Sequence, residues 1–211
     1  MTVLCLTQVP YFVGNGIIDG FDPNESWIQT YTGRRFNPTK PNPSSIVIQD
    51  IAHALSLQCR FSGHTRQFYS VAQHSVGVSY LCDKQDALWG LLHDASEAYL
   101  VDIPNPLKRS GKFNAYLEFE KKMMEAVCVR FNLPITEPAS VKAADRKMLE
   151  IEAQELMSPL RSDWEPKIEK SFLGIRTLSP QESKNLFIKR FLELCDYPGS
   201  IYEEYLRLEN K

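Results

Sequence analysis

The chain has 211 residues, of which 43% are hydrophobic and 24% charged, so it can bury the core of an ordinary globular protein. Its net charge of -2 provides no overall basic field, which argues against a nucleic acid polymer as the partner and favours a small anionic substrate. No apolar run approaches the ~20 residues of a membrane-spanning helix, and no signal peptide is recognisable, so we expect a cytoplasmic protein without membrane contact.

Cysteine usage agrees with a reducing compartment. The five cysteines are odd in number and widely spaced, and they include no C-x-x-C pair. This pattern argues against a disulfide framework and against a zinc ribbon. We therefore expect reduced, mostly buried thiols.

The N-terminal part of the chain is punctuated by helix breakers. Residues 10–43 contain five of the thirteen prolines and four of the ten glycines, which predicts loops with short strands. Within this stretch, Trp27–Tyr31 and Arg35–Phe36 flank Thr32-Gly33, a pattern typical of a small β-hairpin. We treat residues 1–45 as an N-terminal appendage of loop and hairpin.

From about Ile48 onward, apolar residues recur three and four apart, which predicts a mainly α fold with a bundle of five or more helices. Ser70, Asp86 and Ser179 stand where N-caps are expected, and Ser179 is followed by proline and then by glutamate at the third helical position. The predicted helices cover residues 71–81, 87–99, 113–132, 140–157 and 180–194. We place the catalytic domain at 46–160 and a C-terminal helical extension, packed on it, at 161–211.

All four histidines fall within 41 residues, between His53 and His93. His93 is followed by Asp94 inside an apolar helical segment, where an unpaired carboxylate would be costly to bury unless a cation neutralised it. Imidazole and carboxylate together suit a divalent transition metal. His74 shares a helix face with Val71, which directs it toward the core.

A fourth metal ligand is predicted further along the chain, at Asp145. The residues that share its helix face are mostly apolar, and the face is therefore directed at the core; they are Val141, Ala144, Met148, Leu149 and Glu152. Glu97 follows His93 by four residues, so its carboxylate should lie beside the ligands and accept a proton from water. Asp102 precedes a stiff Pro-Asn-Pro turn that ends in Lys108, and this turn could hold a leaving group and a phosphate oxygen.

The residues His74, His93-Asp94 and Asp145 resemble the H…HD…D signature of the HD phosphohydrolase superfamily. Residues 93–108, HDASEAYLVDIPNPLK, are similar to the corresponding segment of bacterial 5′-deoxynucleotidases, and the resemblance extends over residues 46–160. It implies an HD-domain helical bundle that holds one divalent ion, with Co, Mn, Zn, Fe or Ni left open. Glu97 and Asp102 would be the catalytic acid–base pair, in roles that are interchangeable at this point.

The same resemblance implies a phosphate-binding Arg followed by an aromatic residue ahead of the first ligand histidine. Arg60-Phe61 fills these positions, with phenylalanine where the family has tryptophan, and Arg66 is a second phosphate candidate. His64 has two alternative interpretations, a hydrogen-bond donor to phosphate or a loop histidine. His53 is better explained as a packed helix residue. Lys108 completes the expected phosphate clamp.

The expected function is hydrolysis of a nucleotide phosphomonoester, as in a 5′-nucleotidase. Residues 26–160 also look like phage HD hydrolases, which include dATP triphosphohydrolases, so release of triphosphate from a dNTP is the alternative. A non-catalytic nucleotide-binding module is the second alternative. The sequence leaves open whether the chain forms a homo-oligomer.

Overall fold

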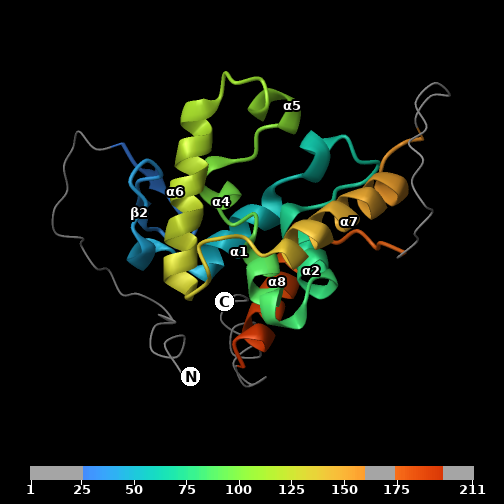
Figure 1. Cartoon of the computed structure of the whole chain (residues 1–211). Helices are drawn as coiled ribbons and strands as arrows, with labels where there is room; N and C mark the ends of the chain where they lie inside the picture. The colour runs from blue at the N-terminus through green and yellow to red at the C-terminus, as the bar shows by residue number, and fades with distance from the viewer. Residues whose placement is uncertain (1–25, 160–173, 197–211) are drawn as a thin grey trace.

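The computed structural model describes residues 26–159 and 174–196, and these residues form a mainly helical body with one short hairpin (Figure 1). The predicted fold class is confirmed. Parts of three predictions lie outside the described residues: the punctuated stretch up to residue 25, the boundary at residue 160 and the thiol of Cys5.

The hairpin pairs β1 (Ile28–Gln29) with β2 (Arg35–Phe36) in antiparallel register, around the Thr32-Gly33 turn that the sequence predicts. Its attachment to the helical body is polar as well as aromatic. The backbone N–H of Thr32 donates to the buried Asp50 carboxylate at 2.7 Å, and Phe36 stacks on Tyr99 with ring centroids 4.3 Å apart. The hairpin is therefore fixed to the helices.

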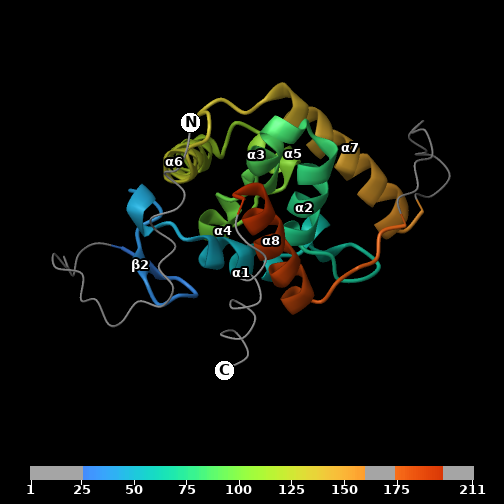
Figure 2. The same cartoon turned by 90° about the horizontal axis from the view of Figure 1, so that it is seen from below.

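The main core forms around three helices, α1 (Ile48–Leu57), α2 (Val71–Leu81) and α8 (Pro180–Leu194). Figure 2 shows α8 lying beside α1 and α2, and each of the two contacts it. Its buried side chains belong to the same core cluster as those of α1 and α2; they are Phe187, Ile188, Phe191 and Leu192. The predicted C-terminal extension thus contributes a central helix.

Two of the predicted N-caps are confirmed. The Ser179 side chain accepts from the backbone of Glu182, whose carboxylate accepts from the Ser179 N–H in return. Ser70 accepts from the Gln73 N–H, but the Gln73 amide turns away from the cap to the 176–178 segment, where it donates to the Arg176 carbonyl and accepts from the Leu178 N–H. This exchange ties the segment before α8 to the start of α2.

The single helix predicted over 87–99 is wrong. The structure has α3 (Ala87–Leu92), tight turns over residues 93–96 and then α4 (Glu97–Leu100). The turns are closed by bonds to the third preceding residue, as from the Glu97 N–H to the Asp94 carbonyl. The His93 ring takes the Gly90 carbonyl, which a regular helix would pair with the Asp94 N–H. Asp86 occupies the N-cap position without a capping bond, since its carboxylate accepts from the Ser140 hydroxyl.

Two of the remaining helices follow the predicted positions closely, α6 (Asn114–Phe131) and α7 (Ala139–Leu156). The short helix α5 (Asn105–Lys108) forms where the sequence predicts only a stiff turn. Short 3₁₀ turns are η1 (Pro43–Ser45), η2 (Arg60–Gly63) and η3 (Lys84–Asp86). Asn132 ends α6 in the left-handed conformation, which asparagine tolerates. In Figure 1, α7 crosses the body near α2, and the two helices are in contact.

The described cysteines are all free, but the expectation of mostly buried thiols is wrong. Cys128 is buried, Cys82 and Cys195 are half-buried, and Cys59 is exposed. None of the helices in the described ranges combines the length and the apolar character that a bilayer crossing requires.

Candidate metal centre

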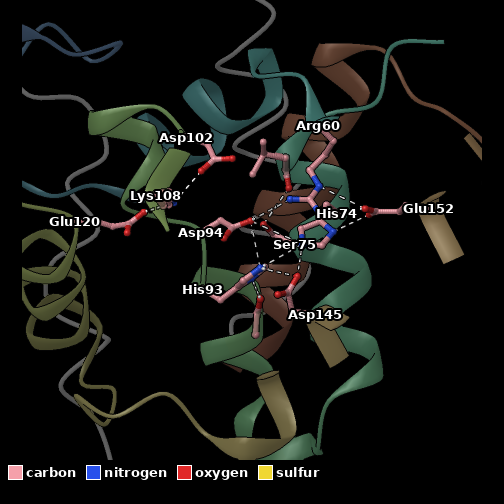
Figure 3. A network of polar contacts seen from close by, with 12 residues as sticks. Arg60, His74, Ser75, His93, Asp94, Asp102, Lys108, Glu120, Asp145 and Glu152 are labelled. Atoms are coloured by element: carbon pink, nitrogen blue, oxygen red, sulfur yellow. Dashed lines mark hydrogen bonds and ion pairs between the residues drawn. The ribbon is translucent and has the colours of Figure 1, made fainter. Parts of the chain in front are cut away.

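Two histidines meet where α2 passes the end of α3 (Figure 3). His74 is the fourth residue of α2 and is fully buried, and His93 directly follows α3. Their Nε2 atoms are 3.2 Å apart. Gly90 permits the close approach of the two helices, because a Cβ at this position would lie 2.8 Å from the sulfur of Cys82.

The second nitrogen of each ring fixes its orientation. Nδ1 of His93 lies 2.8 Å from the Gly90 carbonyl and Nδ1 of His74 lies 2.7 Å from the Glu152 carboxylate. A carbonyl and a carboxylate only accept hydrogen bonds, so both Nδ1 atoms donate. Each neutral ring therefore presents the lone pair of Nε2 to the other, an arrangement that requires a proton or a metal ion between them.

Asp145, on α7, completes a group of three donors. Its Oδ1 lies 3.2 Å from Nε2 of His74 and 3.9 Å from Nε2 of His93. The three donor atoms lie within 4.8 Å of one another. The Asp145 side chain is 43% exposed, so the group opens to solvent on this side.

Asp94 stands at the edge of this group. Its Oδ2 is 3.2 Å from Nε2 of His93 and 3.8 Å from Nε2 of His74, yet this buried oxygen has no hydrogen-bond partner. A buried carboxylate oxygen without a hydrogen-bond partner is costly, and a cation bound beside it would remove that cost. The structure thus brings together all four predicted ligands.

Electrostatics at the group favour a cation. Burial opposes protonation of His93, but the neighbouring charges of Asp94 and Asp145 outweigh it and raise the pKa of His93 to about 9. The same negative field that retains a proton on the imidazole would attract a divalent ion in its place. Two imidazoles and two carboxylates form a donor set that fits a first-row transition metal.

Glu97 begins α4 and is buried close to this group. Burial, together with the charges of Asp94 and Asp102, raises the pKa of Glu97 well above its ordinary value. One of its oxygens, Oε2, has no hydrogen-bond partner. A carboxyl group in this state takes up a proton at a higher pH than an ordinary glutamate does, which suits it to proton transfer.

Asp102 and Lys108 face each other across the predicted turn, which α5 forms (Figure 3). Nζ of Lys108 lies 2.9 Å from Asp102 and 2.7 Å from Glu120. Burial lowers the pKa of Lys108, but the bonds to the two carboxylates outweigh it, so the pKa is raised and the amine stays charged. Val101, just before Asp102, has φ 62 and ψ 151, a conformation that strains a β-branched residue.

The predicted phosphate pair Arg60-Phe61 lies in η2. The Arg60 guanidinium lies 3.3 Å from Glu152 and 4.0 Å from Asp94, so it faces the histidine group. Phe61 and Ser62 both have positive φ, 53 and 52, which is uncommon for a bulky residue. The Phe61 ring lies under the guanidinium, 5.5 Å from ring centroid to Cζ.

Three residues considered from the sequence for a role in the site lie away from the histidine group. Arg66 donates to the Glu155 carbonyl at 2.6 Å and thereby caps the end of α7. His64 is exposed and ends η2. His53 stacks on Tyr31 with centroids 3.8 Å apart, in agreement with a packed helix residue. The described contacts of these residues include none with the histidine group.

Comparison with known proteins identifies the family to which the chain belongs. No protein-family model matches the chain. The chain is 39% identical over 175 residues to the uncharacterised protein YfdR of Escherichia coli, and the alignment covers 81% of this chain and 97% of YfdR. The chain belongs to the YfdR family. An uncharacterised protein of Rhodobacter capsulatus is 37% identical over 145 residues, covering 62% of the chain and 73% of that protein.

Both relatives are uncharacterised, so the function of this YfdR-family chain is argued from its site. The sequence prediction missed Glu152 as a site residue, although its position was visible. Glu152 follows Asp145 by seven residues, two helical turns, and therefore lies on the same face of α7. It is fully buried, and a buried glutamate requires a partner.

A separate cavity of about 340 Å³ lies between β1, α1 and α4 of this YfdR-family chain. It is lined by Tyr31, Asp50, His53 and Tyr99 among others, and it shares no residue with the histidine group. We place the candidate site at the histidine group, because metal-binding donors converge there.

Proposed function

We propose that the chain is an HD-type, metal-dependent phosphohydrolase that acts on a nucleotide phosphomonoester. The observation that carries the proposal is the pair of Nε2 atoms, 3.2 Å apart, with both Nδ1 atoms committed to acceptors and the Asp145 carboxylate beside them. This arrangement supports a bound divalent ion. Membership of the HD superfamily rests on the resemblance of the signature and on this convergence.

His74, His93, Asp94 and Asp145 would hold one ion. When bound, the ion supplies positive charge that binds a phosphoryl oxygen and offsets the negative charge that develops in the transition state. Which first-row metal serves in the cell depends on supply as well as on these ligands.

The chain's own residues provide the proton transfers. Glu97 is buried next to Asp94, and its raised pKa suits it to orient the attacking water and take its proton. Asp102 is 47% exposed, so it can take up a proton from solvent, which it would then give to the leaving oxygen. Lys108 holds Asp102 in place by an ion pair.

Arg60 and Lys108 are the cations that the structure offers to a phosphate. Both already contact carboxylates, Arg60 with Glu152 and Lys108 with Asp102 and Glu120, so each is held in position before the substrate arrives. A guanidinium has five N–H donors in a planar fork, which leaves Arg60 donors for a phosphate oxygen. Lys108 would act as a point charge near the leaving group.

The proposal is tested on chelator-treated protein that is supplied with Co²⁺ or Mn²⁺ and incubated with dAMP and with dATP. Orthophosphate from dAMP supports the proposal, whereas inorganic triphosphate from dATP without orthophosphate from dAMP indicates the dNTP triphosphohydrolase. Binding of metal and nucleotide without turnover indicates a non-catalytic module. Asp145→Asn should abolish release of product, while Asp83→Asn, an exposed aspartate before η3, should leave it unchanged.

A further inference from the structure

Glu152 has no place in the expected set of ligands and catalytic groups, yet it belongs to the polar network and reaches His74 and Arg60 from one side (Figure 3). Its carboxylate is fully buried and contacts two residues of the proposed site. Nδ1 of His74 donates to its Oε1 at 2.7 Å, and Nη2 of Arg60 lies 3.3 Å from its Oε2. One buried carboxylate therefore contacts both His74, a proposed metal ligand, and Arg60, a proposed phosphate-binding residue.

The two contacts of His74 with α7 fix the ring from both sides. Asp145 lies 3.2 Å from Nε2, and Glu152, two turns later on the same helix face, accepts from Nδ1. The bond to Glu152 selects the tautomer with its proton on Nδ1, which leaves Nε2 free to bind a metal.

A simpler explanation is that Glu152 only neutralises Arg60, which is itself largely buried. The distances argue against this as its sole role, because the contact with His74 is shorter, 2.7 Å, than the contacts with Arg60, 3.3 and 3.4 Å. The two explanations predict different behaviour when Arg60 is removed, so they can be separated.

We propose that Glu152 is a positioning residue that orients His74 for metal binding and, by holding Arg60 at the same time, links the metal centre to the phosphate site. The inference rests on the proposed function, because it assumes that His74 binds an ion. According to this inference, metal affinity depends on Glu152 in addition to the four ligands.

The test is a titration of chelator-treated, full-length protein with Co²⁺ alone, followed by calorimetry and by visible absorption of the bound ion. Glu152→Gln keeps the shape of the side chain but removes its charge, and it should lower Co²⁺ affinity roughly 10–100-fold. The same factor is expected in an Arg60→Gln background. Glu150→Gln, a change of the same chemistry on an outward position of α7, is the matched control and should leave the affinity unchanged.

A loss of Co²⁺ affinity in the wild-type background that disappears in the Arg60→Gln background would overturn the inference, since Glu152 would then serve only Arg60. An affinity of Glu152→Gln equal to that of the wild type would overturn it too, while the proposed function survives. Absence of Co²⁺ binding by the wild type would overturn both.

A second measurement needs no variant, in case Glu152→Gln fails to fold. Long-range ¹H–¹⁵N NMR on the wild-type protein reports which nitrogen of His74 carries the proton. A proton on Nδ1 supports the inference, and a neutral ring protonated on Nε2 would overturn it.

Discussion

Replacing Glu97 by glutamine should make the metal-free protein more stable and the enzyme less active. In the unfolded chain this carboxyl loses its proton near its ordinary pKa of 4.5, whereas burial and the charges of Asp94 and Asp102 hold the folded-state pKa well above that value. Between the two values the folded state binds more protons than the unfolded state, so stability falls as pH rises. Each pKa unit of difference corresponds to about 1.4 kcal/mol.

Glutamine cannot lose a proton, so Glu97→Gln removes this loss. The difference in free energy of unfolding between variant and wild type should grow as pH rises above about 4.5 and level off above the folded-state pKa. Urea denaturation of chelator-treated protein over a series of pH values measures it. Turnover of dAMP with Co²⁺ should fall roughly 10²–10⁴-fold, the usual contribution of an acid–base group.

The control is Glu118→Gln, an exposed glutamate of α6 for which neither effect is expected. A flat stability difference across the pH series, or a variant less stable than wild type at pH 8, would refute the account of Glu97. Unchanged turnover would refute its role in proton transfer while leaving the electrostatic account intact.

Three further changes test other parts of the structure. At a Co²⁺ concentration of ~100 Kd the wild type should gain about 2.7 kcal/mol in free energy of unfolding, and His93→Gln should lose most of this gain; an equal gain in denaturation curves would contradict the metal centre. Gly90→Ala should cost about 1–3 kcal/mol, because its Cβ meets backbone of α2 as well as a sulfur, and more than Gly77→Ala, whose Cβ meets only a methionine side chain. Thermal denaturation that ranks the two in the opposite order would contradict the packing. Ser179→Ala should cost about 1 kcal/mol through loss of the capping box, and an unchanged melting temperature would speak against it.

Much of the helical framework follows from local sequence rules. Periodicity and caps placed α2, α6, α7 and α8 within about a residue of their observed bounds, because each has a clear apolar face and a strong signal at one or both ends. The convergence of the four predicted ligands was foreseeable for a related reason. His74 and Asp145 lie on faces that point to the core, and a polar group there must have a partner.

Local rules failed where tertiary contacts decide the structure. The break between α3 and α4 leaves no proline or glycine signal at residues 93–96, since there a side chain, the His93 ring, takes a backbone acceptor. Arg66, a predicted phosphate residue, donates to the Glu155 carbonyl at the end of α7, a partner 89 residues away that no local rule indicates. Glu152 lay on a predicted face, yet its contacts with two distant residues could be seen only in three dimensions.

The position of α8 has a consequence for how the protein is made. The core that supports α2 and α3 includes Phe187 and Phe191, which follow Asp145 and α7 in the chain. All four predicted ligands are therefore translated before the side chains that complete this core. We expect the nascent chain to reach its final packing only after α8 has left the ribosome, and until then the apolar faces of α1 and α2 stay open to aggregation.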